Sequence, residues 1–379
     1  MPAAFTAITS RNDRQDGPVR RSGRPALLLL CALVALLGCV AIREGGGATW
    51  QPPRGHVQKL ALDVRVLGRG EPTIVLLHGL AGSNRYFGAK FDALSSEGRL
   101  VVPDLLGFGG SPRPATGAYD AKLHAAAVSR ALDQLGTEGP IYLVSHSAGA
   151  VVALEVARLR GPQVRGVVAF NPPLYSSGRA ARSHIGRLGL LTRIFLEDGA
   201  LARVACAVMC TFRSTAATLI AWLRPSLPEP IAMDAVEHSW VSYSRTLRKL
   251  VVESQPPRMI DLRSTPIWLV AAADDALMET RFLVQLARAP NVHLDIWSGG
   301  HDLPLSRPFA AVAAIRRALN RTSVRSSVHR TRVSASRGVL GGASSTQLRP
   351  GPAPLGFQPV AARRRAALPR VGLRSRRKL

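Results

Sequence analysis

The chain has 379 residues, of which 46% are hydrophobic, and this is enough for one large domain with an insertion. Its formal net charge is +26, a value that ordinarily suggests nucleic acid or an anionic surface as partner. Residues 321–379 carry fourteen Lys and Arg with no Asp or Glu, but they lack the interleaved aromatic residues that base stacking needs, which argues against nucleic-acid binding.

A basic leader and an uncharged apolar run open the chain. Residues 1–24 hold five Arg and two Asp, and residues 25–42 are mostly Leu, Ala and Val. This order is typical of a secretory signal or a short membrane anchor, and it places the following domain outside the cytoplasm. The run ends in LLGC, which is similar to a bacterial lipobox and would make Cys39 a lipidation site; an uncleaved anchor and cleavage without lipid are the alternatives. Residues 43–55 then read as a linker.

Five short apolar runs within residues 56–320 predict strands, and each is followed by a turn that carries polar or glycine residues. With the motif after each, they are 73–77 before His78-Gly79, 101–103 before Asp104 to Ser111, 140–144 before Ser145 to Gly149, 266–272 before Asp274-Asp275, and 292–297 before Gly300-His301. The candidates for nucleophile, acid and base therefore each stand just past the carboxyl end of a strand.

Ser147 lies between an apolar strand and a run, 150–160, that favours a helix. A serine on such a sharp turn is a nucleophile elbow, in which small neighbours tolerate a strained backbone and the hydroxyl projects above the sheet. The usual pattern is G-x-S-x-G, and here Ser145 replaces the first glycine.

Taken together, these motifs resemble those of the α/β-hydrolase superfamily in order and spacing, from residue 56 to 320. The resemblance implies an α/β fold with a mostly parallel eight-stranded sheet, flanking helices and a helical cap insertion. It also implies that Ser147 attacks the substrate, that His301 moves the proton and that Asp275 fixes the imidazole. Finally, it implies an oxyanion hole made by the backbone N–H groups of Leu80 and Ala148, with His78 and Gly79 supporting that loop.

Two neighbouring carboxylates compete for the place of the acid, and only one can face His301. Ala272-Ala273-Asp274-Asp275 maps onto the family's G-x-x-D turn, which favours Asp275 over Asp274. The other place that the family uses for the acid, after the preceding strand, is occupied here by Asn171, which cannot carry the charge. His146 is interpreted as a packing residue beside the nucleophile, with a place in the floor of the pocket as the alternative.

About 95 residues separate the strand that ends at Phe170 from the strand near Pro266, and this is far longer than an ordinary connection. The cap is therefore expected at about 172–258. Helical patterns within it cover 185–196, 200–209, 214–222 and 233–250. Their apolar residues favour an apolar acyl or alcohol group in the substrate, although part of that face must pack on the core.

No cofactor or metal is expected, because the chain has no P-loop or dinucleotide fingerprint and its four cysteines have no metal-ligand spacing. Cys206 and Cys210, one helical turn apart, favour two buried thiols over a disulfide.

The nature of the nucleophile selects the chemistry. Haloalkane dehalogenases and epoxide hydrolases are similar in their His-Gly and Pro-Asp motifs but have Asp at the elbow, so Ser147 points to acyl chemistry. The leading hypothesis is a membrane-anchored or secreted serine esterase that hydrolyses an apolar carboxylic ester. A carbon–carbon bond hydrolase, a peracid-forming hydrolase and a non-catalytic binding protein of the same fold are the alternatives. The tail, 321–379, is predicted to be disordered and to bind anionic lipid or cell wall.

Overall fold

The computed structural model describes residues 50–54, 57–59, 61–187, 190–197, 199–224, 227–254 and 265–322. The predicted leader, the membrane segment with Cys39, and the tail beyond residue 322 lie outside these residues.

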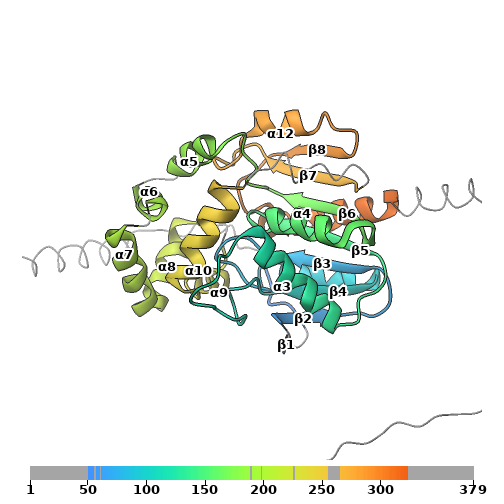
Figure 1. Cartoon of the computed structure of the whole chain (residues 1–379), viewed down its shortest axis with the longest axis horizontal. Coiled ribbons are helices and arrows are strands. Elements are labelled where there is room, and N and C mark those ends of the chain that lie inside the picture. Colours follow the sequence, from blue (N-terminus) through green and yellow to red (C-terminus); the bar gives the residue numbers. More distant parts are fainter. Residues whose placement is uncertain are drawn as a thin grey trace, which may run out of the picture. The chain divides into compact units, whose positions relative to one another are not determined.

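A single sheet organises the described chain, with β3 and β5 at its centre (Figure 1). The strands are β1 Val57–Lys59, β2 Asp63–Leu67, β3 Thr73–Leu77, β4 Arg99–Pro103, β5 Ile141–His146, β6 Val164–Phe170, β7 Ile267–Ala272 and β8 Val292–Trp297. Their order is β1-β2-β4-β3-β5-β6-β7-β8, with the β1–β2 and β2–β4 pairings antiparallel and the other five pairings parallel. The expected mostly parallel eight-stranded sheet is confirmed.

Alternation along the central strands divides the apolar core between the two faces of the sheet. In β3, Val75 and Leu77 belong to one buried cluster, whereas Ile74 and Leu76 belong to the other. This follows from the two-residue period of a strand, because a fully buried strand must be apolar on both sides. The first cluster packs under α3 (Ala121–Gln134) and α4 (Gly149–Arg160), and the second under α2 (Gly88–Phe91) and a helix over 308–322.

The helices between β6 and β7 form the cap, which lies beyond the carboxyl ends of the central strands (Figure 1). They are α5 Gly178–Gly186, α6 Leu190–Leu196, α7 Ala200–Thr211, α8 Arg213–Leu223, α9 Glu229–Asp234, α10 Trp240–Thr246 and a π-helix over Leu247–Val252.

Two of the expected cap helices are each divided in the structure. The predicted helix 185–196 becomes α5 and α6, since α5 ends at Gly186, a residue with low helix propensity. The predicted helix 233–250 ends early at Asp234 and restarts at Trp240, because Ser239 forms a capping box with Ser242. Apolar periodicity alone did not reveal these stops.

Contacts of the catalytic domain extend slightly beyond both of the boundaries that the sequence predicts. Residues 50–54, assigned to the linker, contact this domain: the indole of Trp50 donates to the Arg85 carbonyl, and the backbone N–H of Arg54 donates to Asp92. At the other end the helix continues through Thr322, whose hydroxyl lies 2.6 Å from that of Tyr142. Within the described ranges no single helix is long and apolar enough to cross a membrane, whereas α7 and α8 pass that test only as a pair, bent by 104°.

Two further helices follow β7. The helix α12, Thr280–Leu286, lies near β8, and the short α13, Leu303–Ser306, directly follows the His301 loop.

Candidate active site

Ser147 occupies the turn between β5 and α4 with a φ of 51°, in the left-handed region that non-glycine residues rarely adopt. Two glycines allow this turn to lie tightly against the end of β3. A Cβ on Gly149 would lie 2.4 Å from the His78 carbonyl oxygen, and one on Gly79 would lie 2.9 Å from the Ser147 Cβ. The small residues of both motifs are thus explained by one close approach of backbones.

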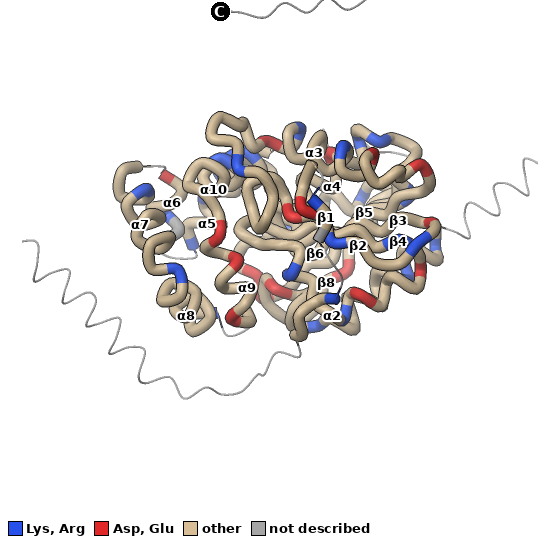
Figure 2. Tube along the Cα trace, turned by 90° about the horizontal axis from the view of Figure 1, so that it is seen from below, with Lys and Arg blue, Asp and Glu red and all other residues tan. Residues whose placement is uncertain are grey.

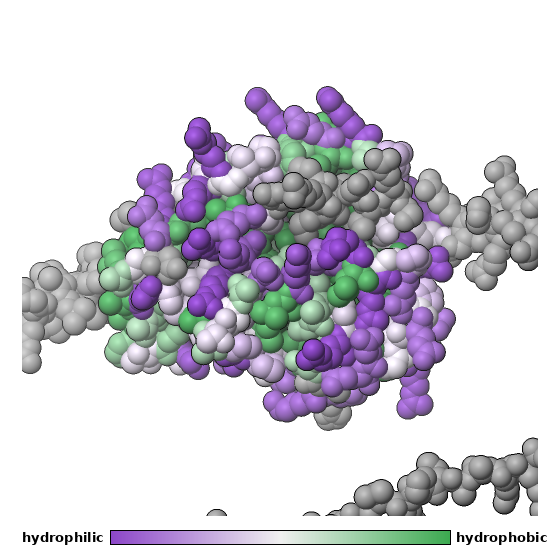
Figure 3. Space-filling model, in the orientation of Figure 1, coloured by the Kyte–Doolittle hydropathy of each residue, from purple (hydrophilic) through white to green (hydrophobic). Residues whose placement is uncertain are grey.

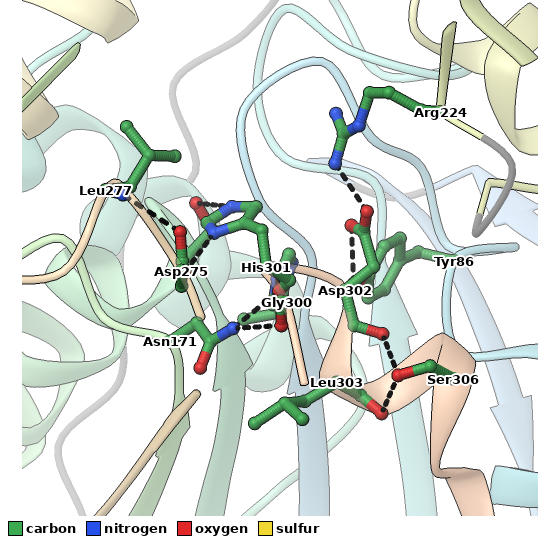
Figure 4. A network of polar contacts seen from close by, with 12 residues as sticks. Tyr86, Asn171, Arg224, Asp275, Leu277, Gly300, His301, Asp302, Leu303 and Ser306 are labelled. Atoms are coloured by element: carbon green, nitrogen blue, oxygen red, sulfur yellow. Dashed lines mark hydrogen bonds and ion pairs between the residues drawn. The ribbon is translucent and has the colours of Figure 1, made fainter. Parts of the chain in front are cut away.

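Ser147, His301 and Asp275 form a continuous chain of contacts. The hydroxyl of Ser147 lies 3.0 Å from His301 Nε2, and His301 Nδ1 lies 2.7 Å from Asp275 Oδ2 (Figure 4 shows the second contact). The Asp275 carboxylate is nearly buried, whereas 18% of the His301 side chain remains exposed. A nucleophile, a base and a group that orients the base are therefore within hydrogen-bonding reach of one another.

Asp274 and Asp275 point to different partners. Asp275 also accepts the backbone N–H of Leu277 at 2.9 Å, so both of its oxygens are used. Asp274 is exposed and accepts the backbone N–H of Gly299 at 3.2 Å, which ties the loop after β7 to the loop after β8. The structure thus brings Asp275, and not Asp274, to the imidazole.

The two residues proposed for the oxyanion hole belong to the turn that carries Ser147 and to the loop after β3. Ala148 is the N-cap residue of α4, and the N–H groups at the start of a helix lack partners within that helix. Leu80 follows Gly79 in the loop after β3, directly before Ala81, which has a φ of 56°. The role of their N–H groups in binding the oxygen of a substrate carbonyl stays a prediction.

His78 fastens that loop to the end of β4. The backbone N–H of Leu105 donates to its Nε2 at 2.8 Å, so the ring proton lies on Nδ1 and is donated to the Gly79 carbonyl at 2.8 Å. Complete burial lowers the pKa of His78 to about 4, which keeps the ring neutral in this role. Asp104 acts in the next turn, where burial raises its pKa to about 6 and its side chain accepts the N–H of Asn84.

The carbonyl of His301 is held by two side chains whose roles the sequence analysis missed. Asn171 donates to it at 2.7 Å and to the Gly300 carbonyl at 3.0 Å (Figure 4). Its own oxygen accepts the N–H of Ala272. His146, whose pKa burial lowers to about 3, contributes Nε2 at 2.9 Å. Asn171 occupies the alternative place of the acid, with a φ of 45°, and there it braces the catalytic loops instead. Asparagine in a left-handed turn after a strand was the available signal.

A second missed group connects the cap to the histidine loop. Arg224, just after α8, forms an ion pair with Asp302, the residue that follows His301 (Figure 4). Tyr86 also contacts Asp302, at 3.3 Å, and its ring stacks on His146 at 4.6 Å. Burial alone would raise the pKa of Asp302, but Arg224 and the two neighbouring histidines hold it below its ordinary value. Only the folded chain brings these distant positions together.

The described part of the chain contains no group of three or more His, Cys, Asp or Glu side chains that could hold a metal ion. Cys206 and Cys210 are free thiols 3.9 Å apart.

Comparisons with known proteins identify the family. The model of the alpha/beta hydrolase family matches residues 74–315. A putative carbamate hydrolase, RutD, of Stutzerimonas stutzeri (strain A1501) is 28% identical over 245 residues, which cover 62% of this chain and 86% of the relative. A probable lysophospholipase, BODYGUARD 3, of Arabidopsis thaliana is 29% identical over 106 residues, which cover 27% of this chain and 21% of that protein.

Among solved structures, the fold is similar to that of an epoxide hydrolase from Vigna radiata, with a TM-score of 0.57 and 18% identity, covering 71% of this chain and 98% of the other. A thermophilic esterase from Thermogutta terrifontis gives a TM-score of 0.53 with 21% identity, covering 71% and 99%.

Proposed function

Because the chain belongs to the alpha/beta hydrolase family, we propose that it is a serine hydrolase that cleaves an apolar carboxylic ester through an acyl-enzyme. The observation that carries this proposal is the unbroken chain of contacts from Ser147 through His301 to Asp275.

In the proposed mechanism, Ser147 Oγ attacks the ester carbonyl carbon while His301 Nε2 takes its proton. The negative oxygen that forms is stabilised by the backbone N–H groups of Leu80 and Ala148. The tetrahedral intermediate then expels the alcohol, which receives the proton from His301, and the acyl group stays on Ser147. A water molecule, deprotonated by His301, releases the acid in the second half, and Asp275 stabilises the imidazolium in both halves.

The residues around the site support an apolar acyl or alcohol group. Leu80, in the loop after β3, and Leu277, which hydrogen-bonds to Asp275, are partly buried and pack against the apolar core cluster. The names of the relatives, a carbamate hydrolase and a lysophospholipase, both describe hydrolysis of carbonyl derivatives, which fits a serine nucleophile. The second of these also fits an apolar substrate.

The proposal includes a location outside the cytoplasm, with attachment to a membrane through residues 20–42. Its support is the order of basic and apolar residues there, followed by the lipobox-like sequence at Cys39. Full-length protein in a bacterial host should stay with the membranes through an alkaline carbonate wash, which releases peripherally bound protein, and a chain that starts at Gly45 should be released by that wash. Metabolic fatty-acid labelling that survives Cys39→Ser would contradict lipidation at this residue.

The main experiment is fluorophosphonate labelling combined with turnover of p-nitrophenyl esters of increasing acyl length. Ser147→Ala should abolish both signals, and Ser145→Ala should retain both, because the buried Ser145 hydroxyl only contacts the Val168 carbonyl. Labelling without turnover of any ester would favour the carbon–carbon bond hydrolase, and turnover only with hydrogen peroxide would favour the peracid-forming one. Absence of labelling in the folded wild-type chain would favour the non-catalytic binding protein.

A further inference from the structure

The α7–α8 hairpin of the cap exposes large apolar side chains on its outer surface (Figure 3, over α7 and α8). Six of the ten large apolar side chains that are exposed in the described part of the chain belong to it. They are Leu201, Val204, Val208, Phe212, Trp222 and Leu223, with exposed fractions between 40% and 63%.

The α7 helix is apolar on both of its faces. Its inner face buries Ala202 and Cys206, while Val204 and Val208, one turn apart on the outer face, are 60% and 53% exposed. The outer face of a surface helix is ordinarily polar, so packing on the domain does not explain the outer residues. A contiguous exposed apolar surface of this kind marks an interaction site.

The charge on the hairpin has one sign. Residues 199–228 contain Arg203, Arg213 and Arg224 and no Asp or Glu, and all three arginines are exposed (Figure 2 shows α7 and α8 as tan tubes with blue positions). Phe212 stands at the bend and Trp222 near the end of α8. Basic residues combined with exposed Trp, Phe and Leu characterise helices that lie in the interface of an anionic bilayer.

We propose that the α7–α8 hairpin is a membrane-docking surface that lies in the interface of an anionic lipid bilayer. The helices have 12 and 11 residues, so each is only about 17 Å long, against the roughly 30 Å needed to cross the hydrocarbon core. With a bend of 104° between them, they fit a surface position and not a span.

Charge selects lipid over the other occupants of this surface. In a symmetric contact between two copies, Arg203 and Arg213 of one copy would face the same basic surface on the other. The chain's own apolar segment, residues 25–42, carries no acid that could pair with them. An anionic lipid supplies both the apolar interior and the opposite charge.

The proposed docking surface is also connected to the catalytic loop through one ion pair. Arg224 directly follows α8 and pairs with Asp302, next to His301. The surface that would touch the bilayer is thus connected to the site where Ser147 would meet an apolar ester.

The test measures whether Trp222 enters lipid, because the N-terminal segment and the tail could also bring the full chain to a vesicle. Full-length Ser147→Ala protein is bound to vesicles of phosphatidylcholine and phosphatidylglycerol with or without brominated acyl chains, and tryptophan quenching is recorded. Trp222→Phe should remove most of the bromolipid-dependent quenching, and Trp268→Phe, a partly buried residue of β7, should retain it. Since Ser147 is absent, the result is independent of ester hydrolysis.

Matched substitutions complete the test. Val208→Glu should raise the lipid concentration needed for half-maximal quenching of Trp222 by at least ~10-fold. Val284→Glu on α12, where the valine is 47% exposed, should leave that concentration unchanged. Arg203→Gln should lower the affinity for anionic vesicles about fivefold at low salt, and Arg281→Gln should change that affinity little. If the bound chain shows no quenching through Trp222, or if sedimentation shows a dimer that Val208→Glu dissociates, the proposal is wrong.

Discussion

The carboxyl edge of the sheet and the α7–α8 hairpin differ in whether other parts of the chain contact their side chains. At the sheet edge, Ser147, Asp275 and Asn171 are nearly buried, and their polar atoms are partnered by other parts of the chain. On the hairpin, large apolar side chains such as Phe212 and Leu223 are more than 60% exposed. Contacts within the molecule therefore determine the geometry of the sheet edge. The apolar residues of the hairpin, in contrast, would be buried only by an external partner.

The sharpest way to break this comparison is to alter the acid at the sheet edge. Asp275→Asn should reduce kcat for a p-nitrophenyl ester by about 10⁴-fold, because an amide at this position holds the wrong imidazole tautomer. Asp274→Asn should have a mild effect, since that carboxylate only accepts the N–H of Gly299. Equal losses in the two variants would show that loop structure, and not the contact with His301, controls the rate.

Positioning of the histidine loop should matter next. Asn171→Ala removes the amide that holds the carbonyls of Gly300 and His301, and a misplacement of about 1 Å costs about 10²-fold in kcat. The loss should appear in kcat more than in KM. Asn291→Ala, which removes an amide bonded to the Thr265 carbonyl, is the matched control and should leave kcat near wild type.

The sequence alone predicts the strands and the triad, but not the residues that hold the catalytic loops in place. The strands around β3, β5, β7 and β8 could be predicted within about two residues because buried parallel strands are short, apolar and bounded by turns. The triad positions followed from motifs at strand ends. The bracing by Asn171 and the pair of Arg224 with Asp302 could not be predicted, because their partners lie 130 and 78 residues away along the chain. The cap helix boundaries depended on local capping, which apolar periodicity does not show.

Burial of neutral histidines predicts a pH dependence of stability. Burial lowers the pKa of His124 to about 3 from 6.5, so the unfolded chain takes up this proton first as the pH falls. Stability should therefore decrease below about pH 6.5, by about 2 kcal/mol at pH 5 for this histidine. Asp104, with its pKa raised to about 6, opposes this trend by about 1 kcal/mol at pH 5, because its folded form takes up a proton first.

Chemical denaturation between pH 7.5 and pH 5 measures this effect. His124→Gln should flatten the slope by up to one proton, because the residue belongs to α3, contacts Thr246 and lies outside the catalytic contacts. A slope that is unchanged in the variant would assign the pH dependence to other groups.

The ion pair between the cap and the sheet edge should have a smaller effect. Asp302→Asn should lower stability more than Arg224→Gln, because Asp302 is buried while the Arg224 side chain is 46% exposed and can be rehydrated. Their coupling in a double-mutant cycle should be about 1 kcal/mol. Zero coupling would separate the cap from the histidine loop and would remove the short path between lipid and active site.

The smallest expected effect distinguishes the end of the folded domain from the basic tail. Deleting residues 323–379 should leave the melting temperature and ester turnover nearly unchanged, because the described helix and its contacts are retained. Deleting residues 321–379 also removes Thr322, which is buried against Tyr142 and hydrogen-bonds to it at 2.6 Å, and should cost about 1 kcal/mol. Thr322→Val in the full chain should reproduce that loss, since it removes only the hydroxyl. If the shorter deletion is as damaging as the longer one, the residues beyond 322, with their thirteen Lys and Arg, stabilise the catalytic domain, and the prediction of a disordered tail fails.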